Sequence, residues 1–201
     1  MNTHILKKPY KIGLTGGIGS GKSTIAQIFK SIEIPIFNSD TCGKELLSND
    51  QDTIRNIIHT FGHHIEKNNL IDKEKLSEIV FSNKEKIEQL NQIIHPKVKL
   101  KFESWVKQQT SHYIIKESAL LFETNTHQLL DKIILVKAPV DIRIKRVCKR
   151  DNRTKQQVQK IIANQIDPNS ITQNADYIIN NDEKTLLTPK IIKIHNILNQ
   201  L

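Results

Sequence analysis

Short apolar runs alternate with helical patterns along much of this chain. Runs rich in β-branched residues predict strands at residues 10–15, 34–37, 113–117, 132–136 and 177–179. Between the first two runs, Ile25, Ile28 and Phe29 recur at helical spacing and predict a helix over 22–31. Alternating strands and helices predict an α/β fold, a parallel sheet of about five strands flanked by helices.

Residues 40–111 interrupt this alternation. No strand is predicted there, and helical patterns cover 52–60, 73–81, 84–94 and 96–109, with a break expected at His95-Pro96. Because a crossover between parallel strands needs only one helix, the additional helices predict an inserted subdomain at about 41–111. We expect one domain over 1–201, whose core comprises residues 1–40 and 112–201.

Five of the seven glycines lie between Gly13 and Gly21. Gly16, Gly21, Lys22 and Ser23 match the P-loop pattern G-x-x-x-x-G-K-[ST], which cradles nucleotide phosphates with backbone N–H groups. A predicted strand precedes this run and a predicted helix follows it, as the pattern requires. The fold class is therefore predicted to be a P-loop NTPase-type sheet, with Lys22 on the β- and γ-phosphates and Ser23 ligating Mg²⁺. The expected nucleotide-binding residues are Gly17, Ile18, Gly19, Ser20, Gly21, Lys22, Ser23 and Thr24.

A segment rich in arginine follows Pro139. Arg143, Arg146, Arg150 and Arg153 are spaced three, four and three residues apart, so one helix would carry them on one face. Guanidinium groups suit phosphate oxygens, and the pattern predicts a basic lid helix within about 141–166. A plain exposed basic helix is the alternative.

Composition narrows the class of protein and its partners. Hydrophobic residues make up 37% of the chain and charged residues 25%, which is typical of a globular protein. No apolar run reaches bilayer length, no secretory signal is evident, and two distant cysteines, Cys42 and Cys148, fit a reducing compartment, so a cytoplasmic location is expected. A net charge of +9 favours anionic partners, but a content of 5% aromatic residues argues against nucleic acid. A small phosphorylated substrate explains the charge at least as well.

An acid follows the second predicted strand. Asp40 stands just beyond residues 34–37, at the sheet edge where such folds bind ligands, and could accept the proton of an attacking hydroxyl. An N-cap role is a compatible alternative. His59 and His63 lie one helical turn apart, but no third ligand of matching kind is evident, so surface histidines are favoured. Without an N-K-x-D motif, a GTPase is disfavoured.

These residues resemble the dephospho-CoA kinase family over nearly the whole chain. The matching pieces, in order, are residues 14–24, Asn38-Ser39-Asp40, Phe61-Gly62, Leu76 with Val80-Phe81, His95-Pro96-Lys97-Val98, Leu120-Leu121-Phe122-Glu123, Arg146 with Arg150-Asp151, Gln165, and Ala175-Asp176 with Asn181. The resemblance implies transfer of the ATP γ-phosphate to the ribose 3′-hydroxyl of dephospho-CoA, with Mg²⁺. It also implies a helical CoA-binding subdomain and a mobile lid. Separately from the resemblance, no nucleic-acid or membrane partner is expected, and the protein is expected to be a monomer or weak homo-oligomer.

The resemblance further implies roles for individual residues. Asp40 would be the catalytic base, Lys22 and Arg146 would neutralise the transferring phosphate, and Arg150 and Asn181 would contact the nucleotide. The implied acceptor-binding residues are Thr15, Asp40, Lys44, Phe61, Lys73, His95, Leu120 and Glu123.

Several positions depart from the family pattern. Lys44 and Lys73 stand where the family usually has Arg, Ala119 replaces a common Pro, and residues 167–170 lack the usual Arg. Lysine keeps the charge but loses the bidentate geometry of a guanidinium. Another small-molecule P-loop kinase, such as a nucleoside monophosphate kinase, and a nucleotide-dependent module acting on nucleic acid are the alternatives.

Overall fold

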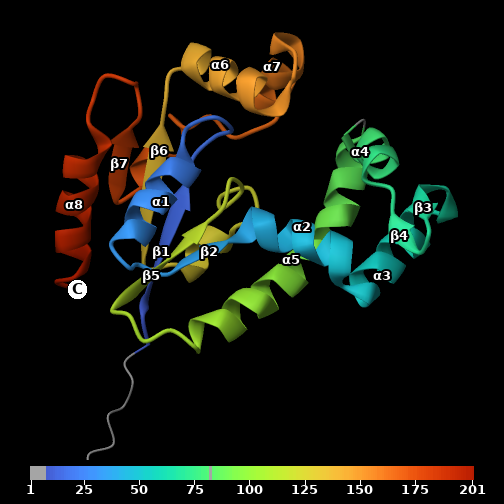
Figure 1. The fold of residues 1–201 in the computed structure, drawn as a ribbon, viewed down its shortest axis with the longest axis horizontal. Helices are drawn as coiled ribbons and strands as arrows, with labels where there is room; N and C mark the ends of the chain where they lie inside the picture. Colours follow the sequence, from blue (N-terminus) through green and yellow to red (C-terminus); the bar gives the residue numbers. More distant parts are fainter. Residues whose placement is uncertain (1–7, 82) are drawn as a thin grey trace, which may run out of the picture. The chain divides into compact units, whose positions relative to one another are not determined.

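A parallel sheet of five strands carries the P-loop (Figure 1). Its strands are β1 (Tyr10–Thr15), β2 (Ile36–Asn38), β5 (Tyr113–Glu117), β6 (Lys132–Lys137) and β7 (Tyr177–Asn180), in the spatial order β2-β5-β1-β6-β7. Every pairing between them is parallel. The predicted α/β fold is confirmed, and the carboxyl ends of all five strands meet at one edge.

The structure is a computed structural model that describes residues 8–81 and 83–201. The described residues up to Asn38 and Val106–Leu201 form one compact unit, and Ser39–Trp105 form a second. Within the described ranges, no helix is both long and apolar enough to cross a bilayer.

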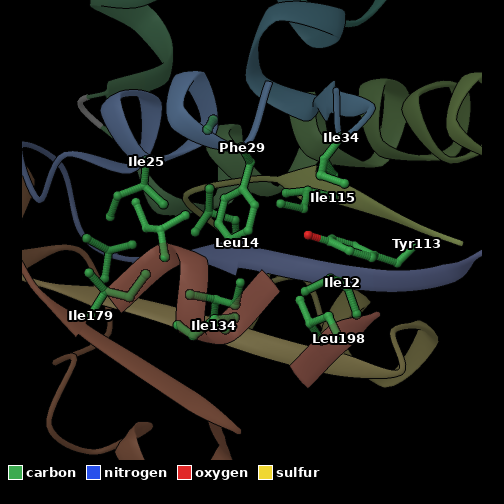
Figure 2. Close-up of a cluster of buried hydrophobic side chains, with 14 residues drawn as sticks. Ile12, Leu14, Ile25, Phe29, Ile34, Tyr113, Ile115, Ile134, Ile179 and Leu198 are labelled. Atoms are coloured by element: carbon green, nitrogen blue, oxygen red, sulfur yellow. The ribbon is translucent and has the colours of Figure 1, made fainter. Parts of the chain in front are cut away.

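Helices α1 (Lys22–Ser31) and α8 (Leu187–Leu198) cover one face of the sheet, where the core of the first unit lies (Figure 2). Ile25 and Phe29 from α1 and Leu198 from α8 are fully buried there against strand residues such as Leu14 and Ile134. A smaller cluster lies under the loops after β5 and before β7, and its buried members are Leu121, Phe122 and Ile133. The remaining elements of the first unit are η2 (Thr126–Leu129), α6 (Val140–Asp151), α7 (Lys155–Ala163) and η3 (Thr172–Asn174).

The second unit has its own core. Its elements are α2 (Ser39–Asn49), α3 (Gln51–Phe61), η1 (His63–Ile65), β3 (Glu66–Lys67), β4 (Leu70–Ile71), α4 (Lys73–Phe81) and α5 (Lys84–Val106). Side chains such as Ile54, Ile57 and Ile65 are almost completely buried in one cluster. Asp50 caps α3, because its carboxylate accepts the Thr53 N–H at 2.7 Å.

Two expectations for this unit are wrong. The chain does not break at His95-Pro96, because α5 runs through Pro96 as a single helix. Proline inside a helix costs about 3 kcal/mol. That cost is offset by apolar contacts on both sides of Pro96: Ile93 and Ile94 before it pack against the core, and Val98 and Phe102 after it are buried. Residues 66–71, where no strand was expected, form the β3–β4 hairpin, whose turn residues Asn68 and Asn69 have positive φ of 54° and 59°.

Candidate functional site

The P-loop connects the end of β1 to the start of α1. Gly21 has φ of 96°, and a Cβ there would collide with the Asn181 side-chain amide. Gly17 needs to be glycine for space, since a Cβ would collide with the Arg143 guanidinium. The pattern of glycines therefore follows from close approach of the loop to side chains of α6 and of the segment after β7.

Lys22 is 8% exposed although it carries a charge. Its Nζ donates to the Gly16 carbonyl oxygen at 2.7 Å and to the Gly17 carbonyl oxygen at 3.3 Å. These bonds hold the ammonium against the loop, at the N-terminus of α1, where the helix dipole also favours an anion. Ser23 and Thr24 follow it, exposed, in the first turn of α1.

Side chains from α6 and from the segment after β7 hold the outer carbonyl groups of the loop. Arg146 Nη1 donates to the carbonyl oxygens of Gly19 at 3.3 Å and Ser20 at 3.4 Å. Asn181 Nδ2 donates to the Ser20 carbonyl oxygen at 2.9 Å, and Arg146 Nη2 donates to Asn181 Oδ1 at 3.1 Å. Arg146 and Asn181, far apart in the sequence, therefore meet at the phosphate loop.

Glu117, which the sequence-based reasoning did not select, lies beside Ser23. It ends β5, is 4% exposed, and accepts the Ser23 hydroxyl at 3.0 Å through Oε1 and the Asn38 amide at 2.8 Å through Oε2. The signal that could have found it is an acid at the carboxyl end of a predicted strand, since such ends share one edge of the sheet with the P-loop.

This cluster suits Mg²⁺ with its phosphate ligands. Mg²⁺ prefers oxygen ligands and often binds through one or two protein groups plus phosphate oxygens, which the Ser23 hydroxyl and the Glu117 carboxylate can supply. Within the described residues, the buried hydroxyl of Ser20 in the same loop lacks a hydrogen-bond partner. An unpaired polar group in a glycine-rich loop is consistent with a polar ligand.

The expected stripe of four arginines is not a single exposed face. Arg143 is buried, with 3% exposed, and packs against the loop. Arg150 is exposed and makes two hydrogen bonds to Asp151, at 2.7 and 2.9 Å. Helix α6 ends at Asp151 and Asn152 is left-handed, with φ of 52°, so Arg153 lies outside the helix.

Three of the expected acceptor residues belong to the first unit. Thr15 ends β1 and is 2% exposed. Leu120 and Glu123 lie in the loop after β5, where Glu123 Oε1 accepts the Ile166 N–H at 3.3 Å. Thr15 is thus at the carboxyl end of β1, and Leu120 and Glu123 follow the carboxyl end of the neighbouring strand β5.

The other expected acceptor-binding residues belong to the second unit. Asp40 and Lys44 are exposed on α2, and because α2 begins at Ser39, Asp40 lies within its first turn rather than at the N-cap position. Lys73 Nζ donates to Ser48 Oγ at 2.8 Å. Phe61 is 8% exposed in the core of the unit, and His95 is half-buried within α5. His63, from the disfavoured histidine pair, lies 2.7 Å from Glu66 Oε2 through its Nδ1.

Solved structures similar to this chain share its fold. The crystal structure of TT1252 from Thermus thermophilus superposes with a TM-score of 0.83 at 25% identity, over 97% of this chain and 99% of that one. Dephospho-CoA kinase from Campylobacter jejuni gives a TM-score of 0.69 at 25% identity, over 94% and 97%. Shikimate kinase from Acinetobacter baumannii, at 14% identity and a TM-score of 0.55 over 97% and 96%, shares the fold alone.

Sequence comparisons give the family. The dephospho-CoA kinase of Fusobacterium nucleatum is 38% identical over 172 residues, covering 85% of this chain and 89% of that protein. The dephospho-CoA kinase of Pasteurella multocida is 32% identical over 193 residues, covering 93% and 94%. The family model described as dephospho-CoA kinase matches residues 10–186, which confirms the resemblance: this chain belongs to the dephospho-CoA kinase family.

Proposed function

We propose that this chain transfers the γ-phosphoryl group of ATP to the ribose 3′-hydroxyl of dephospho-CoA, giving CoA and ADP. The observation that carries the proposal is the cluster of Ser23, Glu117 and Asn38 beside the P-loop, in a chain of this family. A P-loop supplies positioning and electrostatic stabilisation for phosphoryl transfer, and the reaction needs little else besides a base.

Each residue of the first unit has a defined task in this proposal. The loop N–H groups and Lys22 bind the β- and γ-phosphates, and Arg146 compensates charge that spreads over the γ-phosphate oxygens in the transition state. Arg150 and Asn181 would line the nucleotide site. Ser23 would ligate Mg²⁺ while Glu117 orients its hydroxyl. When bound, Mg²⁺ neutralises charge on the β- and γ-phosphates.

The second unit would supply the acceptor side. Asp40 accepts the hydroxyl proton as the 3′-oxygen bonds to the γ-phosphorus and the bond to ADP breaks. Lys44, Lys73 and His95 would bind dephospho-CoA together with Thr15, Leu120 and Glu123, and Phe61 would support that surface from the core. Helices α6 and α7 would act as a lid that excludes water during transfer.

The alternative, another small-molecule P-loop kinase such as a nucleoside monophosphate kinase, is not favoured by the family match. We also propose that the protein works in the cytoplasm, since Cys42 and Cys148 are both free thiols. A monomer or weak homo-oligomer stays a prediction.

The experiment is an acceptor panel with γ-labelled ATP. We expect label in CoA with dephospho-CoA as acceptor, little label with nucleoside monophosphates or shikimate, and loss of transfer in Lys22→Ala. Lys67→Ala, an exposed lysine of the β3–β4 hairpin, is the matched control. Efficient labelling of a nucleoside monophosphate, or none of dephospho-CoA, would contradict the proposal.

A further inference from the structure

Two side chains hold both polar backbone groups of Ile18, at the tip of the P-loop. Arg143 Nε donates to the Ile18 carbonyl oxygen at 2.9 Å, and the Ile18 N–H donates to Gln165 Oε1 at 2.8 Å. Arg143 Nη2 also donates to Gln165 Oε1 at 3.4 Å, which links the two side chains. Arg143 lies in the first turn of α6, and Gln165 lies just after α7. Both ends of the α6–α7 pair therefore meet at one residue of the loop.

The contact is buried and closely fitted. Arg143 is 3% exposed, and burial lowers the pKa of its guanidinium, which nevertheless stays charged. A buried charge is costly unless hydrogen bonds compensate it, and the Ile18 and Gln165 oxygens supply them. The absence of a side chain at Gly17 leaves the space that the guanidinium occupies.

Peptide geometry shows what this contact does to the loop. All described peptide bonds are trans, so the C=O and N–H of one peptide point in opposite directions. By holding the Ile18 carbonyl, Arg143 turns the Gly19 N–H away from α6. By accepting the Ile18 N–H, Gln165 turns the Gly17 carbonyl the other way, where it accepts from Lys22 Nζ and from the Ser20 N–H.

We propose that Arg143 and Gln165 are positioning residues that hold the tip of the P-loop in its phosphate-binding conformation and couple it to the α6–α7 pair. Nucleotide binding at the loop then orders both ends of these helices, and displacement of the helices loosens the loop. The proposal rests on the nucleotide site of the proposed function, but not on the identity of the acceptor.

ADP binding to the full chain, measured by calorimetry, tests the proposal. The variants are Arg143→Met, Arg143→Lys, Gln165→Leu and the Arg143→Met/Gln165→Leu double variant. Lys149→Met, an exposed lysine on α6, is the matched control. We expect Arg143→Met to raise the Kd for ADP by about tenfold or more, and Gln165→Leu by about threefold to tenfold, because hydrogen bonds to buried groups are lost. Arg143→Lys should recover part of the loss. The double variant should bind more tightly than the product of the two single effects predicts, because both act on Ile18.

The control and the acceptor separate positioning from general damage. Lys149→Met should bind ADP like the wild type, and the KM for dephospho-CoA should stay within about twofold in all folded variants. Unchanged ADP affinity in Arg143→Lys and Gln165→Leu would overturn the proposal even if Arg143→Met fails to fold. The proposal would also be overturned if the double variant raised the Kd for ADP by the product of the two single fold-changes. It would be overturned as well if the variants raised the Kd for ADP and the KM for dephospho-CoA equally. A wild-type chain that does not bind ADP would instead refute the proposed function.

Hydrogen exchange tests the coupling itself. We expect ADP to slow amide exchange in the P-loop and in residues 140–163 of the wild type. In the double variant, at ADP concentrations that saturate it, the protection of 140–163 should be lost while some protection of the loop persists. Equal protection of 140–163 in both proteins would overturn the coupling.

Discussion

Asp40 is exposed in the first turn of α2, directly after the strand whose last residue, Asn38, bonds to Glu117. Among the residues that the structure describes, the Asp40 carboxylate has no hydrogen-bond or ion-pair partner, so its removal should cost the fold little. Its chemistry is therefore separable from its contribution to stability. For Glu117 the two contributions are harder to separate, because its side chain is buried and both of its carboxylate oxygens accept hydrogen bonds.

Replacing Asp40 by Asn should lower kcat by about 10²- to 10⁴-fold, because an amide cannot accept the hydroxyl proton. ADP affinity should change by less than about twofold. Steady-state kinetics and calorimetry measure the two quantities. Glu45→Gln, which removes an exposed carboxylate from the same helix, is the control and should retain its activity. Near-normal turnover in Asp40→Asn would remove Asp40 from its role.

Replacing Glu117 by Gln keeps the size of the side chain but removes its charge. Since Glu117 accepts the Ser23 hydroxyl, we expect the Mg²⁺ concentration for half-maximal activity to rise about tenfold. ADP affinity without Mg²⁺ should stay close to that of the wild type. Glu88→Gln, an exposed acid of α5, should leave the Mg²⁺ requirement unchanged. An unaltered requirement in Glu117→Gln would mean that this carboxylate only supports the packing of the strands.

At the scale of the elements, one carboxylate ties two helices of the second unit together. Asp50 caps α3 and accepts Lys97 Nζ from α5 at 2.6 Å. The Lys97 hydrogen bond, followed by those from Thr53, holds the pKa of Asp50 well below its usual range. The folded state therefore favours the ionised carboxylate, and the resulting stability is present above the unfolded pKa and is lost as the pH falls through the folded pKa.

Asp50→Asn keeps an oxygen that can cap α3 but removes the charge that pairs with Lys97, so it should lower the free energy of unfolding at pH 7 by up to about 1 kcal/mol. It should also flatten the loss of stability as the pH falls below about 4, where the unfolded chain takes up a proton that the folded wild-type carboxylate resists. Urea unfolding followed by the fluorescence of Trp105, the sole tryptophan, measures both. Asp52→Asn, at an exposed neighbouring acid, should keep the wild-type slope. An equal slope in Asp50→Asn would show that other carboxylates dominate the acid response.

The elements also show where local patterns suffice. Strands β1 and β5 and helix α1 begin and end where the hydrophobic pattern predicts, because most of their apolar side chains are buried. The β3–β4 hairpin was missed because its two-residue strands carry too little periodicity, although Asn68-Asn69 is a plausible turn. Pro96 predicted a break between two helices, but α5 continues through it because apolar residues before and after the proline are packed in the core.

At the scale of the whole molecule, the net charge of +9 could favour polyanions. Two arginines near the P-loop already have partners within the protein. Arg143 and Arg146 donate to carbonyl oxygens of the loop, and Arg146 Nε also pairs with Glu183 at 3.1 Å. These guanidinium groups serve a local site rather than a continuous exposed surface. The charge therefore does not by itself indicate nucleic-acid binding.

We predict that the protein shows no steep, salt-dependent binding to double-stranded DNA or single-stranded RNA at about 150 mM salt. The reason is that a content of 5% aromatic residues offers little surface on which bases could stack. Fluorescence anisotropy over a salt series measures the binding. ADP binding in the same buffer is the control for folded protein. Micromolar affinity with a steep salt slope would revive the nucleic-acid alternative.

The sequence by itself determined the P-loop, the parallel sheet and the family. Each depends on patterns within short stretches or on their order along the chain: backbone N–H groups around consecutive glycines, and alternation of strand and helix. Only the tertiary structure decided that Glu117 serves Ser23, 94 positions away, and that Arg143 and Gln165 meet at Ile18, 125 and 147 positions away. The spacing of the arginines predicts that they share one face of a helix. It does not predict that Arg143 is buried, because burial depends on which segment packs against that face. Contacts between distant segments follow from how the sheet brings strand ends together, which no local pattern contains.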